Sequence, residues 1–279
     1  MKPLTAQTIL NPSDHPNIVY KFRDWKNKNH KKILTKREIF IPSPKDFNDP
    51  FDCRIPESYY MLNTDERIDK YICGFVNRNL DYFKVNKIDI PTYVAFLKSD
   101  LKENTNIYQR KLNQIYVREG DQHFGIFSTS KIWDNILMWA HYSSNHSGFC
   151  VGLNRENLYD NLPNASAASV MYKKKFPQID PFDDFFQKMF DKSHSKAINW
   201  KYEKEYRFFI NSYPEELTIE RRKIKISKDC YNCVMIGLTF PEDQINNIMK
   251  LSDRLEVPLF QIYIAGQTFR IKRKKIKLS

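Results

Sequence analysis

Short apolar runs and strict alternation of apolar with polar residues mark the strands of this 279-residue chain. At 17–23, for example, Ile18, Tyr20 and Phe22 alternate with residues of the opposite face, which is the period of a β-strand. Similar runs, bounded by turn residues, predict further strands. They lie at 38–41, 124–128, 148–153, 170–172, 206–210, 223–226, 233–236 and 260–264.

Helical spacing dominates the segment from 65 to 117. Ile68, Ile72, Val76 and Leu80 recur every four residues, so they share one face of a helical stretch. The segment is otherwise polar and poor in distinctive chemistry, which predicts a helical insertion or lid, or else a plain packing layer. Shorter helices are expected at 134–142, 181–199 and 243–254.

Strands and helices are interspersed along the chain, without an internal repeat or a low-complexity linker. We therefore expect one α+β domain over 1–279, with a central mixed or antiparallel sheet that carries the 65–117 insertion. The basic segment 270–279 is expected to be an edge strand or a tail.

The formal net charge of +12 favours polyanionic partners such as RNA, DNA, nucleotides or anionic membranes. An AT-rich genome that encodes lysine freely would give the same charge without such a partner. Only 7 glycines are present, which argues against a glycine-rich phosphate loop. From this charge we expect nucleic acid as a possible partner. No stretch approaches the roughly 20 apolar residues of a membrane span, so no membrane association is expected.

Cysteine usage points to a reducing compartment. The 5 cysteines are scattered, and the first 17 residues contain no apolar run long enough for a signal peptide, so we expect a cytoplasmic protein. Cys230 and Cys233 form a C-x-x-C pair. No second pair completes the four ligands of a structural zinc site, so no metal is predicted.

Three separate stretches carry polar groups suited to catalysis, each at or beside a predicted strand. They are Tyr20-Lys21-Phe22-Arg23, Ser128-Thr129-Ser130 and Glu203-Lys204-Glu205. If those strands are neighbours, the side chains converge on one cleft. Asn48 and Asp49, followed by Pro50, form a turn that can hold a loop rigidly beside such a cleft.

Glu203 and Glu205 point to the same face if their segment is extended. Two carboxylates on one face repel each other, so one can have a raised pKa and act as a base or stabilise a developing positive charge. The alternative is that they form surface ion pairs with Lys201, Lys204 and Arg207, which would contribute little to stability.

Ser128 and Ser130 also share a face of an extended strand, and their hydroxyl groups can hold a ribose or an amide. Neither lies in a G-x-S-x-G sequence, so a hydrolase nucleophile is not supported. The alternative is that these serines end the strand and cap the helix that begins near Asp134.

The segment 123–153 surrounds the serines with aromatic and imidazole groups. Trp139 and Tyr142 belong to a predicted helix, and Tyr142 at its end can stack on a planar ring. His141 and His146 lie five residues apart, which is not the spacing of H-E-x-x-H. A single imidazole hydrogen-bonded beside a cleft is favoured over a metal pair.

Three motifs together resemble a bacterial family of domains of unknown function. They are N-D-P-F-[DE] at 48–52, M-W-x-H-Y at 138–142 and W-x-x-E-x-E-[YW]-R at 200–207, after a Tyr-Lys-aromatic start at Tyr20. The resemblance extends from Tyr20 to about Gly237. It implies membership of that family and brings no established activity.

The chain also resembles ADP-ribosyltransferases of the Arg-Ser-Glu type. In chain order it offers a basic residue on a first strand (Arg23 or Lys21), S-T-S on a middle strand and E-x-E near a later strand. The resemblance implies an ADP-ribosyltransferase-like fold with NAD as the substrate.

The same resemblance implies a role for each site residue. The residues expected to bind NAD are Tyr20, Lys21, Arg23, Ser128, Ser130, Trp139, His141 and Tyr142. Among these, the basic strand would hold the pyrophosphate, Ser128 the nicotinamide ribose, and Tyr142 with Trp139 the nicotinamide ring. Glu205 would stabilise the oxocarbenium-like transition state, and Glu203 would orient the acceptor.

The sequence thus favours an NAD-dependent ADP-ribosyltransferase-like enzyme or NAD glycohydrolase, as a toxin or phage-defence effector acting on nucleic acid or protein. Two other hypotheses stay open. One is a nuclease-like hydrolytic toxin that uses His141, His146 and the carboxylates. The other is a non-catalytic module that binds nucleic acid through its basic face.

Overall fold

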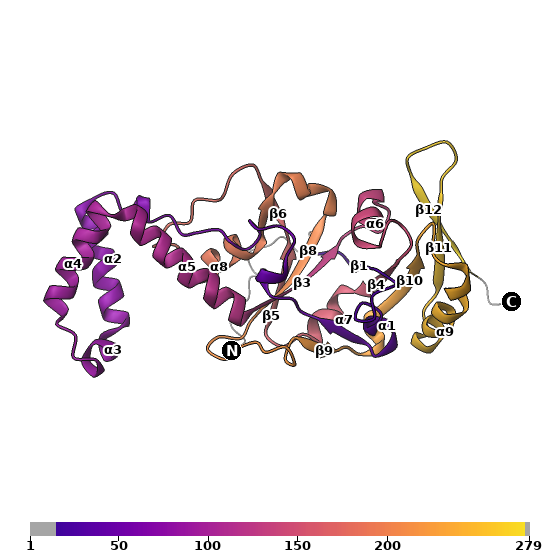
Figure 1. Cartoon of the computed structure of the whole chain (residues 1–279), viewed down its shortest axis with the longest axis horizontal. Coiled ribbons are helices and arrows are strands. Elements are labelled where there is room, and N and C mark those ends of the chain that lie inside the picture. The colour runs from indigo at the N-terminus through magenta and orange to yellow at the C-terminus, as the bar shows by residue number, and fades with distance from the viewer. Residues whose placement is uncertain (1–14, 277–279) are drawn as a thin grey trace.

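The computed structural model describes residues 15–276 of the chain. Its central sheet contains, in spatial order, β12 (Ile271–Lys275), β11 (Leu259–Ile264), β10 (Tyr231–Ile236), β4 (Phe149–Asn154), β1 (Ile18–Arg23), β3 (Phe124–Ser130), β8 (Glu205–Asn211) and β5 (Ala165–Ser169) (Figure 1). Neighbouring strands are antiparallel except β10 and β11, which are parallel and joined through α9 (Ile245–Leu255). The predicted α+β domain with a mixed central sheet is therefore confirmed.

Smaller elements surround this sheet. Two further strand pairs are β2 (Glu38–Phe40) with β9 (Lys223–Lys225), and β6 (Met171–Lys173) with β7 (Ser195–Ala197). The helices that pack near the sheet are α1 (Lys32–Thr35), α6 (Ile136–Tyr142), α7 (Arg155–Asp160) and α8 (Phe185–His194). Within 15–276, no helix has both the length and the apolar composition to cross a lipid bilayer.

Helix α8 is shorter than the helix predicted at 181–199. The carboxylate of Asp184 accepts hydrogen bonds from the backbone amides of Phe186 and Gln187, so the helix begins only after it. It ends at His194 because the chain continues directly as the extended strand β7. The helix predicted from the apolar spacing therefore extended beyond both ends of α8.

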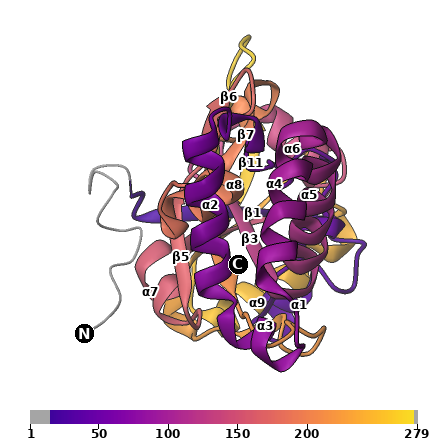
Figure 2. The same ribbon diagram turned by 90° about the vertical axis from the view of Figure 1, so that its left-hand side faces the viewer.

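Four helices form an arm at one end of the molecule: α2 (Asp65–Arg78), α3 (Leu80–Val85), α4 (Ile90–Glu103) and α5 (Thr105–His123) (Figure 1). Figure 2 views the molecule from that end and shows α2 beside α4. Their apolar faces meet in a cluster that includes Ile72, Phe83 and Leu97 and is separate from the core under the sheet. The arm thus has its own small core.

The two faces of the sheet are covered by different helices. Because side chains alternate along β4, Phe149 and Val151 join the main core with α1, α7 and α9, while Cys150 points to the other face. There it packs with Trp139 of α6 and Phe22 of β1. Helix α6 is therefore fixed against β1 by apolar contacts.

Strand β1 is paired unequally on its two sides. It pairs with β4 over all six residues, but among the described residues it pairs with β3 only through Tyr20 and Ser130. Beyond that pair the strands separate, and the Lys21 ammonium donates a hydrogen bond to the carbonyl oxygen of Ser128 across the gap. This fork between β1 and β3 is where the cleft described next lies.

Candidate functional site

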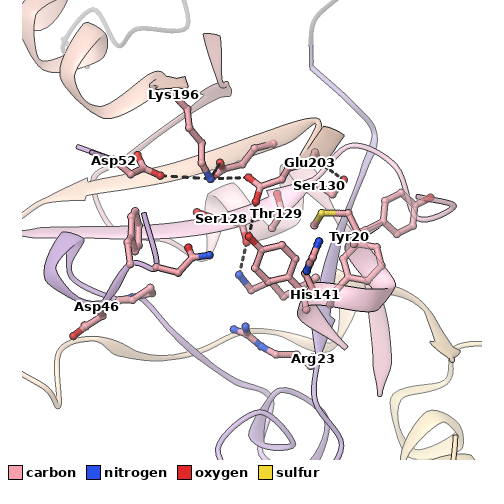
Figure 3. A pocket seen from close by; sticks show the side chains of 18 residues that line it. Tyr20, Arg23, Asp46, Asp52, Ser128, Thr129, Ser130, His141, Lys196 and Glu203 are labelled. Atoms are coloured by element: carbon pink, nitrogen blue, oxygen red, sulfur yellow. Dashed lines mark hydrogen bonds and ion pairs between the residues drawn. The ribbon is translucent and has the colours of Figure 1, made fainter. Parts of the chain in front are cut away.

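A cavity of about 440 Å³ opens at the fork between β1 and β3 (Figure 3). Its walls come from β1, β3, α6, the turn after β2, and the segments around β7 and β8. The predicted site residues that border it are Tyr20, Lys21, Arg23, Ser128, Ser130, His141, Tyr142, Glu203 and Glu205. The three polar stretches, more than 70 residues apart in the sequence, therefore meet in one cleft.

Arg207 organises the deepest wall. Its fully buried guanidinium forms two hydrogen bonds with Asp52, at 2.8 and 2.5 Å, and two with Glu205, at 2.6 and 3.0 Å. It also donates to the carbonyl oxygen of Ser193, at 2.6 Å. Such bidentate pairing is the geometry in which arginine binds carboxylates most strongly. The sequence alternative of exposed, weak ion pairs is wrong for Arg207.

Lys196 is the second cation of this wall. Its ammonium lies 2.6 Å from Glu203, 3.1 Å from Glu205 and 3.5 Å from Asp52 (Figure 3). Burial lowers the pKa of Lys196, but the three carboxylates outweigh burial and raise it above its usual value. The cluster of Asp52, Glu203, Glu205, Lys196 and Arg207 thus holds three carboxylates and two cations, so one carboxylate is left without a cation of its own.

Glu203 is the carboxylate in excess. One of its oxygens accepts a hydrogen bond from the Tyr142 hydroxyl at 2.5 Å, and Asn48 also hydrogen-bonds that hydroxyl. Burial and the nearby Glu205 raise the pKa of Glu203, although Lys196 opposes the shift. Burial would raise the pKa of Glu205 too, but Arg207 and Lys196 hold it well below its usual value. The sequence expectation that the two carboxylates differ in pKa agrees with these environments.

The backbone turns between the two carboxylates. Glu203 ends a short 3-10 helix, Lys204 has the left-handed conformation (φ 48°, ψ 46°), and Glu205 begins β8. The expectation of an extended segment with both side chains on one face is therefore wrong. Both carboxylates still reach Lys196, at 2.6 and 3.1 Å.

The hydroxyl groups of β3 hold this wall in place. Thr129 donates to the carbonyl oxygen of Tyr206 at 2.7 Å, and Ser130 donates to that of Glu203 at 2.6 Å. The Ser128 side chain hydrogen-bonds Glu205. These serines do not cap α6, since Asn135 accepts from its first amides instead.

The opposite wall, on β1, carries cations of a different kind. Lys21 and Arg23 are partly exposed in the cleft, and neither forms an ion pair with a described residue. Lys21 donates to the Ser128 carbonyl, and Arg23 has no side-chain hydrogen bond within 15–276. Burial lowers the pKa of Lys21 well below its usual value and that of Arg23 to about 10. An anion in the cleft would stabilise both charges.

The aromatic residues of 123–153 divide between core and cleft. Trp139 is fully buried, its indole donates to the carbonyl oxygen of Trp133 at 2.7 Å, and its ring meets Phe22 edge-on. It does not border the cleft, so the predicted stacking role is not available to it. Tyr142, the last residue of α6, and Tyr20 of β1 do border the cleft.

The two histidines do not share a site. His141 borders the cleft and is exposed, whereas His146 lies after the end of α6 in the left-handed conformation and does not. The nuclease hypothesis therefore loses one of its two imidazoles at this cleft. Cys230 and Cys233 are both buried and free, in different apolar clusters. Across 15–276, no group of three or more His, Cys, Asp or Glu residues is arranged to hold a metal ion.

Lys196 and Asp52 are the site residues that the sequence did not single out. Lys196 is one of 45 basic residues and lies in a plain S-K-A stretch, so nothing local marks it. Asp52 ends the N-D-P-F-D motif, and its turn was expected to stand beside a cleft. Asn48 of the same turn reaches Tyr142, so the motif does supply part of the cleft wall.

Comparison with known proteins bears on only part of the chain. Residues 138–208 match the model of a family described as a protein of unknown function (DUF2971). Searches of curated proteins and of solved structures returned no match. The matched segment contains Tyr142, Lys196, Glu203 and Glu205, so it includes most of the charged wall, while β1 and the N-D-P-F-D turn lie outside it. Over residues 138–208, the chain is similar to this family of unknown function.

Proposed function

We propose that the cleft binds NAD and breaks the bond between its nicotinamide and its ribose, with transfer of ADP-ribose to an acceptor or to water. The observation that carries the proposal is that a cationic strand, a hydroxyl-bearing strand and a carboxylate pair border one cavity. Its volume of about 440 Å³ is within the range of roughly 300–1,000 Å³ typical of small-molecule sites.

Lys21 and Arg23 are assigned to the pyrophosphate. Both cations reach the cleft without an acidic partner among the described residues, and arginine binds phosphate oxygens in a bidentate manner. The rings of Tyr142 and Tyr20 are assigned to the nicotinamide, because each borders the cleft and offers a face for stacking. Ser128 and His141 also border the cleft, and their side chains suit the ribose hydroxyl groups.

Glu203 is assigned to the developing positive charge, in place of Glu205. The bond from ribose C1′ to the nicotinamide nitrogen breaks with its electron pair on that nitrogen, so positive charge builds up on the ribose. Two cations already neutralise Glu205, whereas Glu203 shares only Lys196 and a tyrosine hydroxyl. The acceptor oxygen then bonds C1′ and loses its proton, which Glu203 can take.

The decisive experiment measures nicotinamide release from labelled NAD by the full chain. Glu203→Gln keeps the shape of the side chain and removes its charge, so turnover should fall at least about 100-fold while NAD binding persists. Glu103→Gln, on the exposed end of α4, is the matched control and should leave turnover unchanged. Undiminished turnover in Glu203→Gln would overturn the proposal.

Glu205→Gln separates the two carboxylates. It leaves Arg207 and Lys196 with one fewer buried anion, so we expect a lower free energy of unfolding together with a loss of turnover. Product analysis in the presence of cell nucleic acid and protein identifies the acceptor. Transfer to nucleic acid would suit a toxin or phage-defence effector with this basic surface.

A further inference from the structure

A second chamber, of about 390 Å³, adjoins the cleft. Asp52 and Lys196 line both cavities, so this ion pair forms part of the wall between them. The remaining lining comes from the turn at 49–55, the end of β6 with the residues that follow it (173–177), and β7. Nothing in the proposed NAD chemistry uses this chamber.

Two aromatic residues at the chamber have half or more of their surface in solvent. Phe51 is 62% exposed and Phe176 is 50% exposed, although both could be expected inside a protein. Their ring centroids are 6.4 Å apart and their planes are inclined by 57°. Each ring therefore keeps a face to which a planar group can be added.

Three consecutive lysines accompany these rings. Lys173, Lys174 and Lys175 all line the chamber. Lys173 lies 3.8 Å from Asp191, while Lys174 and Lys175 are exposed and form no ion pair with a described residue. Adjacent cations and aromatic faces are the combination that binds single-stranded nucleic acid, since lysines bind phosphates and rings stack on bases.

Two oxygen atoms in the chamber wall lack hydrogen-bond partners within 15–276. Asp49, only 5% exposed, uses one carboxylate oxygen for the Phe51 amide and leaves Oδ2 without a partner. Ser195, 2% exposed, has an unpaired hydroxyl group in the same wall. Buried polar atoms are normally satisfied, so these two oxygen atoms are exceptions beside the chamber.

We propose that this chamber docks a base of single-stranded DNA or RNA, stacked on Phe51 or Phe176, with the adjacent phosphates on Lys174 and Lys175. An acidic peptide fits less well, because it would bring carboxylates toward Asp49 and offers the rings no planar partner. A duplex fits less well because its bases are stacked on each other. Identifying the docked base as the ADP-ribose acceptor rests on the proposed function, whereas the docking itself does not.

The test measures binding of fluorescent homopolymers of single-stranded DNA and of RNA to the full chain by anisotropy, without NAD. Phe176→Ala should weaken binding about tenfold, since one base–aromatic stack is worth roughly that ratio. The double variant Lys174→Ala/Lys175→Ala should make the slope of log affinity against log salt shallower by about 1.4, because two phosphate contacts are lost. Both side chains are exposed, so the fold should persist.

Matched controls lie on the far hairpin. Phe269 is 96% exposed and Lys272 and Lys274 belong to edge strand β12, so Phe269→Ala and Lys272→Ala/Lys274→Ala remove the same groups elsewhere. If the control variants weaken binding as much as the chamber variants do, the proposal is overturned, and the nucleic acid binds through the overall positive charge of the surface. A duplex or a poly-glutamate peptide that binds as tightly as the single strand would also overturn it. Because NAD is absent, failure here leaves the Glu203 experiment unaffected.

Discussion

The two walls of the cleft hold their charges in opposite ways. On the β8 side, Arg207 and Lys196 lie among three carboxylates, and almost every polar atom has a partner. On the β1 side, Lys21 and Arg23 border the cavity and form no ion pair with a residue of 15–276. Paired, buried charges fix the position of a wall, whereas unpaired cations are poised for a ligand.

This difference separates stability from binding. Removing one member of a closed ion cluster leaves its partners charged and desolvated, which lowers the free energy of unfolding. Removing a cation that has no partner takes away a desolvation penalty and, with it, the site for an anion. Substitutions on the two walls should therefore change different measured quantities.

The largest effect is expected from Arg207→Met. It leaves Asp52 and Glu205 buried without their shared bidentate partner, so the free energy of unfolding should fall by about 3–5 kcal/mol. Urea denaturation followed by circular dichroism measures the change. Arg221→Met removes an exposed partner of Glu215 and is the control, with little change expected. An equally small change in the two variants would show that the buried cluster around Arg207 does not stabilise the fold more than a surface ion pair does.

Acid should also weaken the closed wall. His194, behind it, is 1% exposed; burial, and then the charge of Arg207, lower its pKa to about 3. Between about pH 6.5 and pH 3 the unfolded chain binds a proton that the folded chain does not, so stability is lost as pH falls, by roughly 5 kcal/mol in total. Urea denaturation across that range measures the loss, and His194→Phe should make it smaller. An identical pH profile in the variant would show that His194 is not the group responsible for the loss of stability.

The open wall should respond through binding. Arg23→Met and Lys21→Met should each weaken the affinity for ADP-ribose about tenfold to 100-fold, because a charged hydrogen bond is lost. For Arg23→Met the free energy of unfolding should stay equal or rise, since a cation without a partner within 15–276 leaves a partly buried position. Lys21→Met also loses the hydrogen bond to the Ser128 carbonyl oxygen, so its free energy of unfolding should change little in either direction. Calorimetric titration and urea denaturation give the two quantities. A loss of stability without a loss of affinity would reverse the roles of the walls.

The smallest effect concerns the turn that aims the carboxylates. Lys204 is exposed and left-handed, so Lys204→Gly should relieve backbone strain and raise stability by about 1 kcal/mol at most. Lys201→Gly, in the preceding 3-10 helix, should lower stability by a similar amount. Thermal unfolding compares the two variants. A lower melting temperature in Lys204→Gly would show that the lysine side chain itself holds the turn.

Local pattern predicted most of the strands and helices, although it missed β5 and placed β7 inside a helix. Alternation at 17–23 and the apolar run at 124–128 correspond to β1 and β3, and helical spacing corresponds to α6. These signals are local, because burial of one face repeats with the period of the element. The stretches around Tyr20, Ser128 and Glu203 could be proposed as one site because each has unusual polar groups beside a strand.

The environment of each charge could not be predicted. Whether Glu205 is exposed or buried depends on Asp52, which is 153 residues away in the sequence, through their shared Arg207. Lys196 gives no signal until β6 and β7 pair and carry it to the carboxylates. The turn at Lys204 was missed because no glycine or asparagine marks it.

The single backbone pair between Tyr20 and Ser130 has a consequence for how the cleft can be studied. Past that pair, β1 and β3 no longer pair with each other, and two main-chain groups of β3 have other partners: the Ile126 amide donates to Pro42, and the Ser128 carbonyl oxygen accepts from Lys21. Facing main-chain groups without such a partner would resemble those at the rim of a sheet. A ligand can extend the interrupted ladder through those groups, whatever the side chains are. Part of its recognition would then be invisible to alanine scanning, and slowed amide exchange along β1 on binding would reveal it.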